Sequence, residues 1–293
     1  MPYAGPIRYV FLAPHADDEL LSMGAAIHEH VLAHGPDAVA VVLAGTGEAS
    51  GARHALRDAG YVPLGETTPQ RRDLSRREFV ASRDAEFYES CRALGIPHGS
   101  IYMPGFTLAE GDGSVYRRGS YTTASIPRLA RMREGWGLLD ASRFVDAVVG
   151  WFGPGVHYKT MSYVDPSMDH RLLGVALRRC SLPVGSRRYY FPPYRLDRLP
   201  RDAPATYGRD ARSAWLPALH AAGMAYGRWE PERGRFAVGW CSVGAFFGGP
   251  AGEMLRCPSR VPPATRAAEC GRIGSVAAPN APFFEHARTV MHL

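Results

Sequence analysis

The feature that most constrains this chain is an apolar run that ends in a cluster of charged side chains. Residues 7–12 are apolar apart from Arg8 and rich in β-branched and aromatic side chains, a pattern that predicts a buried strand. The segment His15–Glu19 follows, with one histidine and three consecutive acids, and residues 20–33 are predicted to form a helix. A second apolar run at 38–43 completes a strand–helix–strand unit, which predicts an α/β fold with parallel strands.

The three acids could serve only as helix caps, because negative charge is favoured at a helix N-terminus. Capping accounts for one or two acids, but not for His15 directly behind a buried strand. His15 and Asp18 are three residues apart and carry atoms that bind metal ions such as Zn²⁺. Asp17, beside Asp18, would then stay free to act as a general base. We therefore predict a metal-dependent active site at this strand–helix junction.

A second junction of the same kind lies in the middle of the chain. Residues 155–164 pass from a strand-like segment into a loop with a proline, and residues 171–180 are predicted to be helical. Asp169 and His170 stand between them. Because the carboxyl ends of parallel strands meet at one edge of a sheet, we expect His170 to be the third ligand of the ion in the first cluster. Asp169 is predicted to orient a ligand histidine or the base.

Composition limits the class of protein and its partners. The 293 residues are 46% hydrophobic and 21% charged, which is typical of globular proteins. The net charge of +6 comes from arginines, with Lys159 as the one lysine, and no basic stripe predicts a nucleic-acid partner. No apolar run approaches the ~20 residues of a membrane span, and no signal peptide is visible. Five cysteines without CxxC spacing favour reduced thiols in the cytoplasm; export, with Cys257 paired to Cys270, stays an alternative.

The rest of the chain is less regular. Periodicity predicts helices at 76–94, 138–151 and 211–225, strands at 101–103 and 187–191, and a short strand or hairpin at 237–247. Residues 49–74 are predicted to be loop, and 104–135 to be a substrate-facing insertion, because loops of that length are usually functional or mobile. We expect a catalytic domain over residues 1–194 and a smaller, irregular C-terminal lobe over 195–293 that packs on it.

Four motifs carry a resemblance to a known family. Pro14–Glu19 resembles the A/P-H-P-D-D-E motif of the N-acetylglucosaminyl-phosphatidylinositol de-N-acetylase (PIG-L/LmbE-like) family, with alanine in place of the second proline. Asp169-His170 resembles the end of its H-P-D-H motif, and Arg83–Glu86 its R-x-x-E helix. Thr46–Glu48, after the second predicted strand, also fits. The resemblance spans residues 7 to about 180 and implies a Rossmann-like parallel sheet flanked by helices.

The resemblance also implies chemistry. It matches His15, Asp18 and His170 to the family's zinc ligands, Asp17 to its general base, and Arg83 to an arginine that contacts substrate in some members. The other interpretation of Arg83 is a surface ion pair with Glu86, three residues further along the same predicted helix.

Ser167 departs from the family pattern. It stands where the first histidine of H-P-D-H helps to stabilise the tetrahedral intermediate, and loss of such a group can reduce the rate about 10²-fold or more. Either His157, Lys159 or His286 replaces that histidine, or the activity is weak.

The sequence thus supports more than one function. The first hypothesis is Zn²⁺-dependent hydrolysis of an N-acyl amide, above all N-acetyl, on a small amino-sugar-containing metabolite or glycosylated natural product. The insertion at 104–135 and the aromatic segment 189–194 suggest a substrate larger than a monosaccharide. The alternatives are a metal-retaining binding protein without strong catalysis, an amidase for a non-sugar conjugate, and a metal phosphoesterase. The last would need two metal ions, and the sequence offers ligands for one site.

Overall fold

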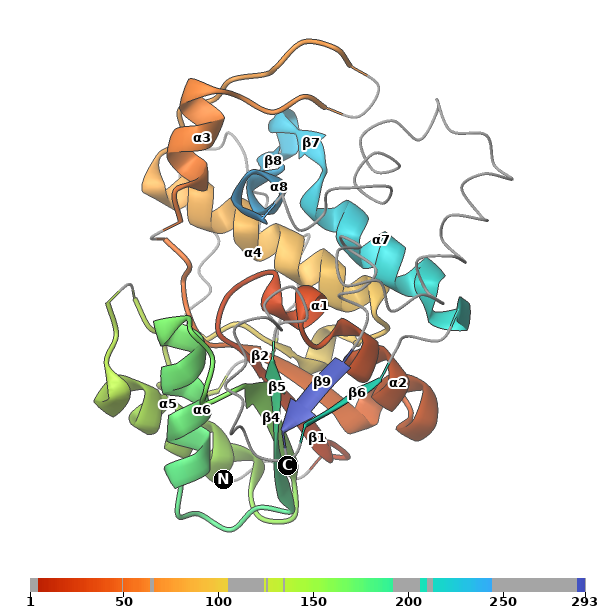
Figure 1. The fold of residues 1–293 in the computed structure, drawn as a ribbon, viewed down its shortest axis with the longest axis vertical. Helices are drawn as coiled ribbons and strands as arrows, with labels where there is room; N and C mark the ends of the chain where they lie inside the picture. Colours follow the sequence, from red (N-terminus) through yellow and green to blue (C-terminus); the bar gives the residue numbers. More distant parts are fainter. Residues whose placement is uncertain are drawn as a thin grey trace.

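A central sheet organises the molecule, as the computed structural model shows (Figure 1). The structure describes residues 5–48, 50–63, 66–104, 124, 126–133, 135–191, 206–209, 213–243 and 289–292. Within these ranges the main sheet has the strand order β3-β2-β1-β4-β5-β9-β6. Its strands are β1 (Tyr9–Ala13), β2 (Val39–Leu43), β3 (Ile101–Tyr102), β4 (His157–Met161), β5 (Ser186–Phe191), β6 (Thr206–Arg209) and β9 (Thr289–His292).

The first five strands in this order are parallel. Strand β9 pairs antiparallel with β5, and β6 pairs antiparallel with β9 at the edge of the sheet. Because β1 lies between β2 and β4, the chain crosses from one half of the sheet to the other after β3. This reversal is the point at which ligands bind in doubly wound α/β proteins. The predicted α/β fold with a Rossmann-like parallel sheet is confirmed.

Helices cover both faces of the sheet. One face carries α2 (Gly24–His34), α4 (Arg76–Ala93) and α7 (Leu216–Tyr226), and the other carries α5 (Leu138–Phe152) and α6 (Met168–Arg179). Side chains of a strand alternate between the two faces. Phe11 of β1 accordingly joins the core under α2 and α4, and Leu12 joins the core under α5 and α6. Both are fully buried, which explains why the strands are nearly continuous apolar runs.

Three predicted elements differ from the structure. The helix expected over 20–33 is two helices, α1 (Asp18–Leu21) and α2, separated by Ser22 and Met23. The segment 49–74, predicted to be loop, contains helix α3 (Ala52–Asp58). The strand or hairpin expected at 237–247 is helix α8 (Val238–Val243).

The described part of the C-terminal half joins the first half closely. Helix α7 packs along α4, and β9 lies between β5 and β6 in the main sheet (Figure 1). A small hairpin-like pair, β7 (Trp229–Glu230) and β8 (Arg235–Phe236), precedes α8. A domain boundary at residue 194 stays a prediction. Short 3₁₀ turns complete the described elements, at Pro36–Ala38, His98–Ser100, Ser213–Trp215 and Pro231–Arg233.

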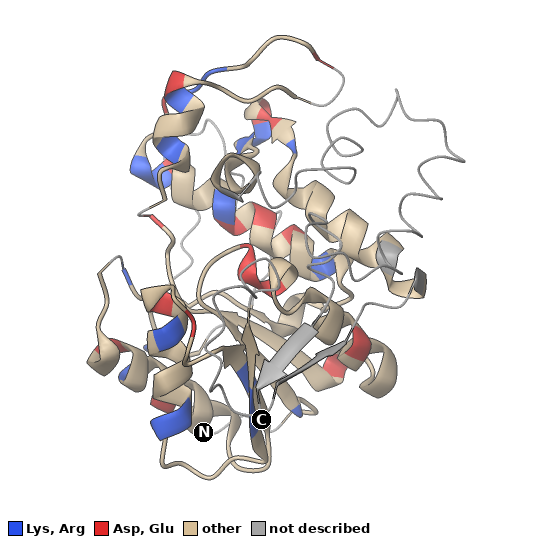
Figure 2. Cartoon of the chain, viewed as in Figure 1, with Lys and Arg blue, Asp and Glu red and all other residues tan. Residues whose placement is uncertain are grey.

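Charged residues are spread over the described helices, and those on α1 and α4 lie next to the site (Figure 2). Figure 2 shows acidic residues on α1, above the sheet, and residues of both signs along the neighbouring α4. None of the described helices combines the length and the apolar character needed to cross a membrane. Cys91, Cys180 and Cys241 are free thiols, whereas Cys257 and Cys270 lie outside the described residues.

Candidate metal centre

The first predicted cluster lies where β1 ends and α1 begins. The Oδ2 atom of Asp18 accepts a hydrogen bond from the backbone N–H of His15 at 3.0 Å. The same oxygen lies 3.3 Å from Nδ1 of the His15 ring. Asp18 is 1% exposed, because α1 folds back over the end of the sheet. The turn after the strand therefore holds the carboxylate and the imidazole against each other.

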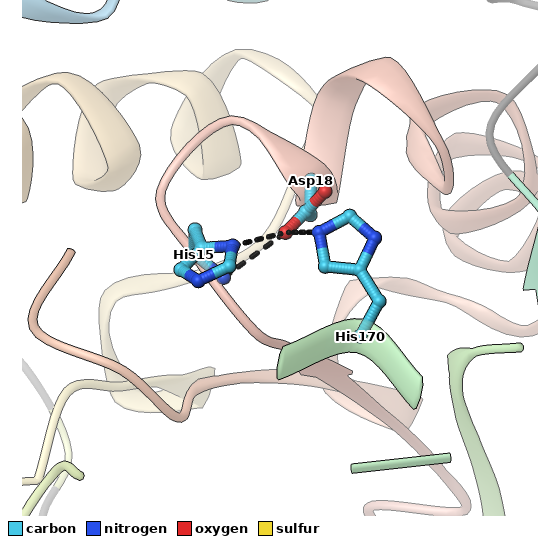
Figure 3. Close-up of side chains that lie close together, drawn as sticks. All are labelled: His15, Asp18 and His170. Atoms are coloured by element: carbon cyan, nitrogen blue, oxygen red, sulfur yellow. Dashed lines mark hydrogen bonds and ion pairs between the residues drawn. The ribbon is translucent and has the colours of Figure 1, made fainter. Parts of the chain in front are cut away.

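The second junction brings His170 to this cluster, as predicted. His170 is in the first turn of α6, and its Nε2 atom lies 3.2 Å from Oδ2 of Asp18 (Figure 3). Ligand atoms of His15, Asp18 and His170 all lie within 4.8 Å of one another. Among the described residues, this is the one group of three or more such side chains close enough to hold a metal ion.

The outward-facing nitrogen of each histidine contacts a further carboxylate. Nε2 of His15 lies 3.0 Å from Oδ2 of Asp169, and Nδ1 of His170 lies 3.1 Å from Oδ2 of Asp165. A carboxylate that accepts from one ring nitrogen leaves the lone pair of the other nitrogen for a metal. With a metal ion bound, the nitrogens with that lone pair would be the two that face Asp18. The donor set therefore fits a divalent ion such as Zn²⁺, with two imidazoles and one carboxylate.

Electrostatics hold the three groups in place. Burial would raise the pKa of Asp18, but His170 and His15 outweigh it and hold this pKa below its usual range. Burial would lower the pKa of His170, but Asp18 and Asp165 outweigh it and raise this pKa to about 10. In the metal-free protein His170 is therefore positively charged and balances the negative charge of Asp18 and Asp165. A bound metal ion would supply that positive charge instead.

Asp17 lies beside the cluster but does not belong to it. Its backbone has φ +120°, a conformation that costs an L residue free energy and that tends to occur at functional sites. Oδ2 of Asp17 accepts a hydrogen bond from Nη2 of Arg83 at 3.0 Å, and Asp17 is 6% exposed. Burial raises the pKa of Asp17 to about 6, although Arg83 opposes the shift. A carboxyl with such a pKa can accept a proton near neutral pH.

Arg83 lies behind Asp17, on α4, rather than at the surface. Its guanidinium also donates to the backbone oxygen atoms of Ala16 and Gly47. The alternative of a surface ion pair with Glu86 is wrong, because both side chains are buried and Glu86 binds the start of α8 instead. A role for Arg83 in contacting substrate stays a prediction.

The glycine-rich turn after β2 packs against this site. A Cβ on Gly45 would come within 2.6 Å of the backbone oxygen of Pro14, so only glycine allows the two turns to approach. Gly47 has φ +63° and lies against the Arg83 guanidinium. The turn thus packs against both the His15 loop and the Arg83 side chain.

Two of the three residues considered as substitutes at Ser167, His157 and Lys159, lie within the sheet. Ser167 is the N-cap of α6, and its N–H donates to Asp165. His157 begins β4 opposite Tyr9, at the far end of the sheet from His15, and its Nδ1 contacts Ser186. Lys159 pairs with Phe11 in the middle of the sheet and is 2% exposed. His286 lies outside the described residues.

Part of the predicted insertion lies next to the metal centre. Met132 pairs with Gly45, and a Cβ on Gly45 would lie 3.7 Å from Cδ2 of the His15 ring. A pocket of about 580 Å³ has Met132 in its lining. The same lining includes Arg128, Arg133, Trp136 and Arg143. Most of residues 104–135 lie outside the described ranges, so their role as a substrate-facing insertion stays a prediction.

One residue of the site is not among those that the sequence predicts. Asp165 is fully buried and joins His170 to the N-terminus of α6 through Ser167. Its signal in the sequence is a carboxylate five residues before a predicted ligand, at the end of a strand. Such a signal is weak, because the direction of the side chain depends on the turn.

Fold and site together define an α/β protein with two histidines and one carboxylate placed so that they could hold a metal ion at the carboxyl edge of a parallel sheet. Residues 10–180 match the family model of GlcNAc-PI de-N-acetylase, PIG-L. The match covers more than half of the chain, which therefore belongs to the PIG-L family. The resemblance predicted from the motifs is confirmed. A comparison with curated protein sequences found no match.

Solved structures are similar in fold. The zinc-inhibited form of teicoplanin deacetylase Orf2 has a TM-score of 0.50 and 14% identity, over 97% of this chain and 96% of that chain. The A40926 pseudoaglycone deacetylase Dbv21 has a TM-score of 0.48 and 15% identity, over 98% and 96%. The N,N′-diacetylchitobiose deacetylase from Pyrococcus horikoshii has a TM-score of 0.44 and 16% identity, over 83% and 78%.

Proposed function

We propose that this protein hydrolyses an N-acetyl or related N-acyl amide on an amino-sugar-containing small molecule, with Zn²⁺ as cofactor. The observation that carries the proposal is the placement of a buried, raised-pKa carboxylate, Asp17, next to a set of three metal-ligating side chains. Membership of a family described as a de-N-acetylase of an N-acetylglucosamine lipid supports the reaction class. Fold alone would not, because one fold hosts many functions.

Each residue of the site has a defined task in this mechanism. His15, Asp18 and His170 would hold the ion, with Asp169 and Asp165 fixing the two imidazole rings. When bound, Zn²⁺ supplies a Lewis acid that polarises a carbonyl and lowers the pKa of a water molecule to about 7.

Asp17 performs the proton transfers. The water oxygen bonds to the acyl carbon while the Asp17 carboxylate accepts the water proton. The C–N bond then breaks, and Asp17 returns the proton to the leaving nitrogen. The products are a carboxylic acid and a free amine, so atoms and charge balance. Arg83 holds Asp17 in position and stabilises its charged form.

The pocket beside Met132 supports a substrate larger than one sugar. Trp136 offers an aromatic surface, and Arg128, Arg133 and Arg143 offer exposed guanidinium groups. A glycoside could place its amide at the metal centre and its scaffold toward this pocket. Because four arginines and one aspartate line the pocket, a scaffold with acidic groups would be favoured over a neutral one.

The test uses zinc-loaded protein and a panel of amides. N-acetylglucosamine, N,N′-diacetylchitobiose, an N-acylated glucosaminyl glycoside and a non-sugar N-acetyl amine are incubated separately, and the release of acid and of primary amine is measured. Turnover of the sugar amides is expected. Asp17→Asn should lower kcat by about 10² or more while its zinc content stays equal to that of the wild type.

Three outcomes would redirect the proposal. An Asp17→Asn variant with full activity would contradict the mechanism. Turnover of the non-sugar amide alone would favour an amidase for another conjugate. Binding of the panel without any turnover would favour the metal-retaining binding protein that Ser167 suggests.

A further inference from the structure

The peptide unit that joins Ala16 to Asp17 is held at both of its polar atoms. Its carbonyl oxygen, on Ala16, accepts a hydrogen bond from Nη2 of Arg83 at 2.5 Å. Its N–H, on Asp17, donates to Oε2 of Glu19 at 2.9 Å. The orientation of this peptide sets the φ angle of Asp17, which is +120°. Such a conformation persists only where surrounding contacts enforce it. The two hydrogen bonds are those contacts.

Glu19 is itself fixed from a distant part of the chain. The hydroxyl of Tyr226, at the end of α7, donates to Oε1 of Glu19 at 2.5 Å. Glu19 and Tyr226 are both 0% exposed. One oxygen of the Glu19 side chain thus accepts a hydrogen bond from the Asp17 amide, and the other accepts one from the Tyr226 hydroxyl. Since a buried carboxylate without donors is costly, Tyr226 fixes the direction in which Glu19 points.

The position of the Tyr226 ring is also fixed. A Cβ on Gly239 would lie 2.2 Å from Cδ1 of Tyr226, so α8 approaches this ring as closely as a glycine permits. The N–H of Gly239 donates to Oε2 of Glu86 at 2.7 Å, and Glu86 belongs to α4. Helices α4, α7 and α8 therefore hold the ring in one place, and the hydroxyl has one direction in which to donate.

We propose that Tyr226 is a positioning residue for Asp17, acting through Glu19, and that the C-terminal half thereby completes the active site. The proposal rests on the proposed function, in which Asp17 is the base. Tyr226 touches neither the metal ligands nor the space of the substrate in this scheme. Its loss should therefore reduce turnover, because a small misplacement of the base is costly, and should leave substrate binding and metal content unchanged.

The experiment compares Tyr226→Phe with Tyr61→Phe in the full-length protein. The Tyr61 hydroxyl donates to the backbone oxygen of Gly227, directly after α7, at 2.8 Å. Both variants remove one hydroxyl that binds near the end of α7, but the Tyr226 hydroxyl binds Glu19, whereas the Tyr61 hydroxyl binds a backbone oxygen. With zinc-loaded protein and N,N′-diacetylchitobiose, we expect kcat to fall about tenfold or more in Tyr226→Phe, with KM within about twofold of wild type. In Tyr61→Phe both constants should stay within about twofold.

A second measurement needs no substrate and no metal. Hydrogen exchange of the Asp17 amide, followed by NMR in the metal-free protein, reports the hydrogen bond to Glu19. Exchange should become about tenfold faster in Tyr226→Phe and stay unchanged in Tyr61→Phe. Should Tyr226→Phe fail to fold, Glu19→Gln takes its place with the same two measurements, because it keeps the size of the side chain and replaces the carboxyl group with an amide.

A double variant separates positioning from general destabilisation. If Tyr226 acts through Asp17, then adding Tyr226→Phe to Asp17→Asn should cause no further loss of kcat. Equal behaviour of Tyr226→Phe and Tyr61→Phe in both kcat and amide exchange would overturn the positioning proposal while leaving the proposed function intact. Full activity of Asp17→Asn would instead overturn the mechanism on which both depend, and unaltered amide exchange would again reject the role of Tyr226.

Discussion

Nη2 of Arg83 lies 3.0 Å from Oδ2 of Asp17, and the two side chains are only 4% and 9% exposed. Burial raises the pKa of Asp17, and the guanidinium limits that rise to about 6. The charged form of Asp17 is therefore favoured by a residue 66 positions away in the sequence. Arg83 thus connects the edge of the sheet to helix α4 and sets the chemistry of the site.

Removing this guanidinium should change the pH dependence of the reaction. Arg83 lowers the pKa of Asp17, so Arg83→Gln should raise it. The base would then stay protonated to a higher pH, and the acid limb of the kcat/KM profile should shift upward by about one unit or more. The matched control is Arg57→Gln, because Arg57 pairs with Asp58 at the surface. An unshifted acid limb in Arg83→Gln would show that Asp17 does not titrate in this limb.

The two outer carboxylates should control metal affinity. Asp169→Asn and Asp165→Asn each remove an acceptor that fixes one imidazole, and each should weaken Zn²⁺ binding by about 10–100-fold. Competition with a chromophoric chelator measures the affinity. Asp140→Asn is the control, because Asp140 binds the N–H of Gly137 at the start of α5, far along the chain from the site. Affinities unchanged in both test variants would contradict the assigned ligand set.

Metal binding should release a proton. In the metal-free protein the pKa of His170 is about 10, because Asp18 and Asp165 outweigh the effect of burial. His170 is therefore protonated below that pH, and a metal ion must displace the proton. Affinity for Zn²⁺ should rise as pH rises, by about tenfold per unit for one proton released. Titration calorimetry in two buffers of different ionisation enthalpy counts the protons. Affinity that does not vary with pH would mean that His170 binds metal without losing a proton.

A buried ion pair should contribute to stability where a surface pair does not. Arg131 and Asp84 form an ion pair with side chains 5% and 4% exposed, which ties the segment beside Gly45 to α4. Asp84→Ala leaves the Arg131 charge buried without its partner and should lower the free energy of unfolding by about 3–5 kcal/mol. Denaturant unfolding measures this change.

The surface pair of Arg57 with Asp58 supplies the comparison. Its side chains are 46% and 61% exposed, and Asp58→Ala should leave the free energy of unfolding close to that of the wild type. Equal effects of the two variants would contradict the structural role of Asp84.

Much of the site can be predicted from the sequence because its residues lie at strand ends. His15, Asp18 and His170 come together as predicted, since parallel strands deliver their carboxyl ends to one edge. Asp165 cannot be predicted in this way, because its role depends on a turn that points it back at His170. The sequence shows Glu19 only as part of the acidic cluster, and its contact with Tyr226 spans 207 residues.

Helix α8 shows how tertiary contacts override local preference. Its residues, Val238–Val243, include β-branched and aromatic side chains that favour a strand. The first backbone N–H groups of a helix lack partners within it. Here Glu86 of α4 accepts from the N–H groups of Val238 and Gly239, which supplies a cap from a different helix. Helix α3 differs from the prediction for another reason. Glycine and proline residues around it favour a loop, although the residues within it favour a helix.

The sequence by itself determined the class of fold and the three residues that could hold a metal ion. Alternation of apolar strands with helices and the polar residues at strand ends are local patterns, and they follow from backbone geometry. Only the tertiary structure decided the pKa and the orientation of Asp17. Arg83, Glu19 and Tyr226 act on it through burial and hydrogen bonds between distant segments, and neither burial nor direction is encoded in the spacing of residues along the chain.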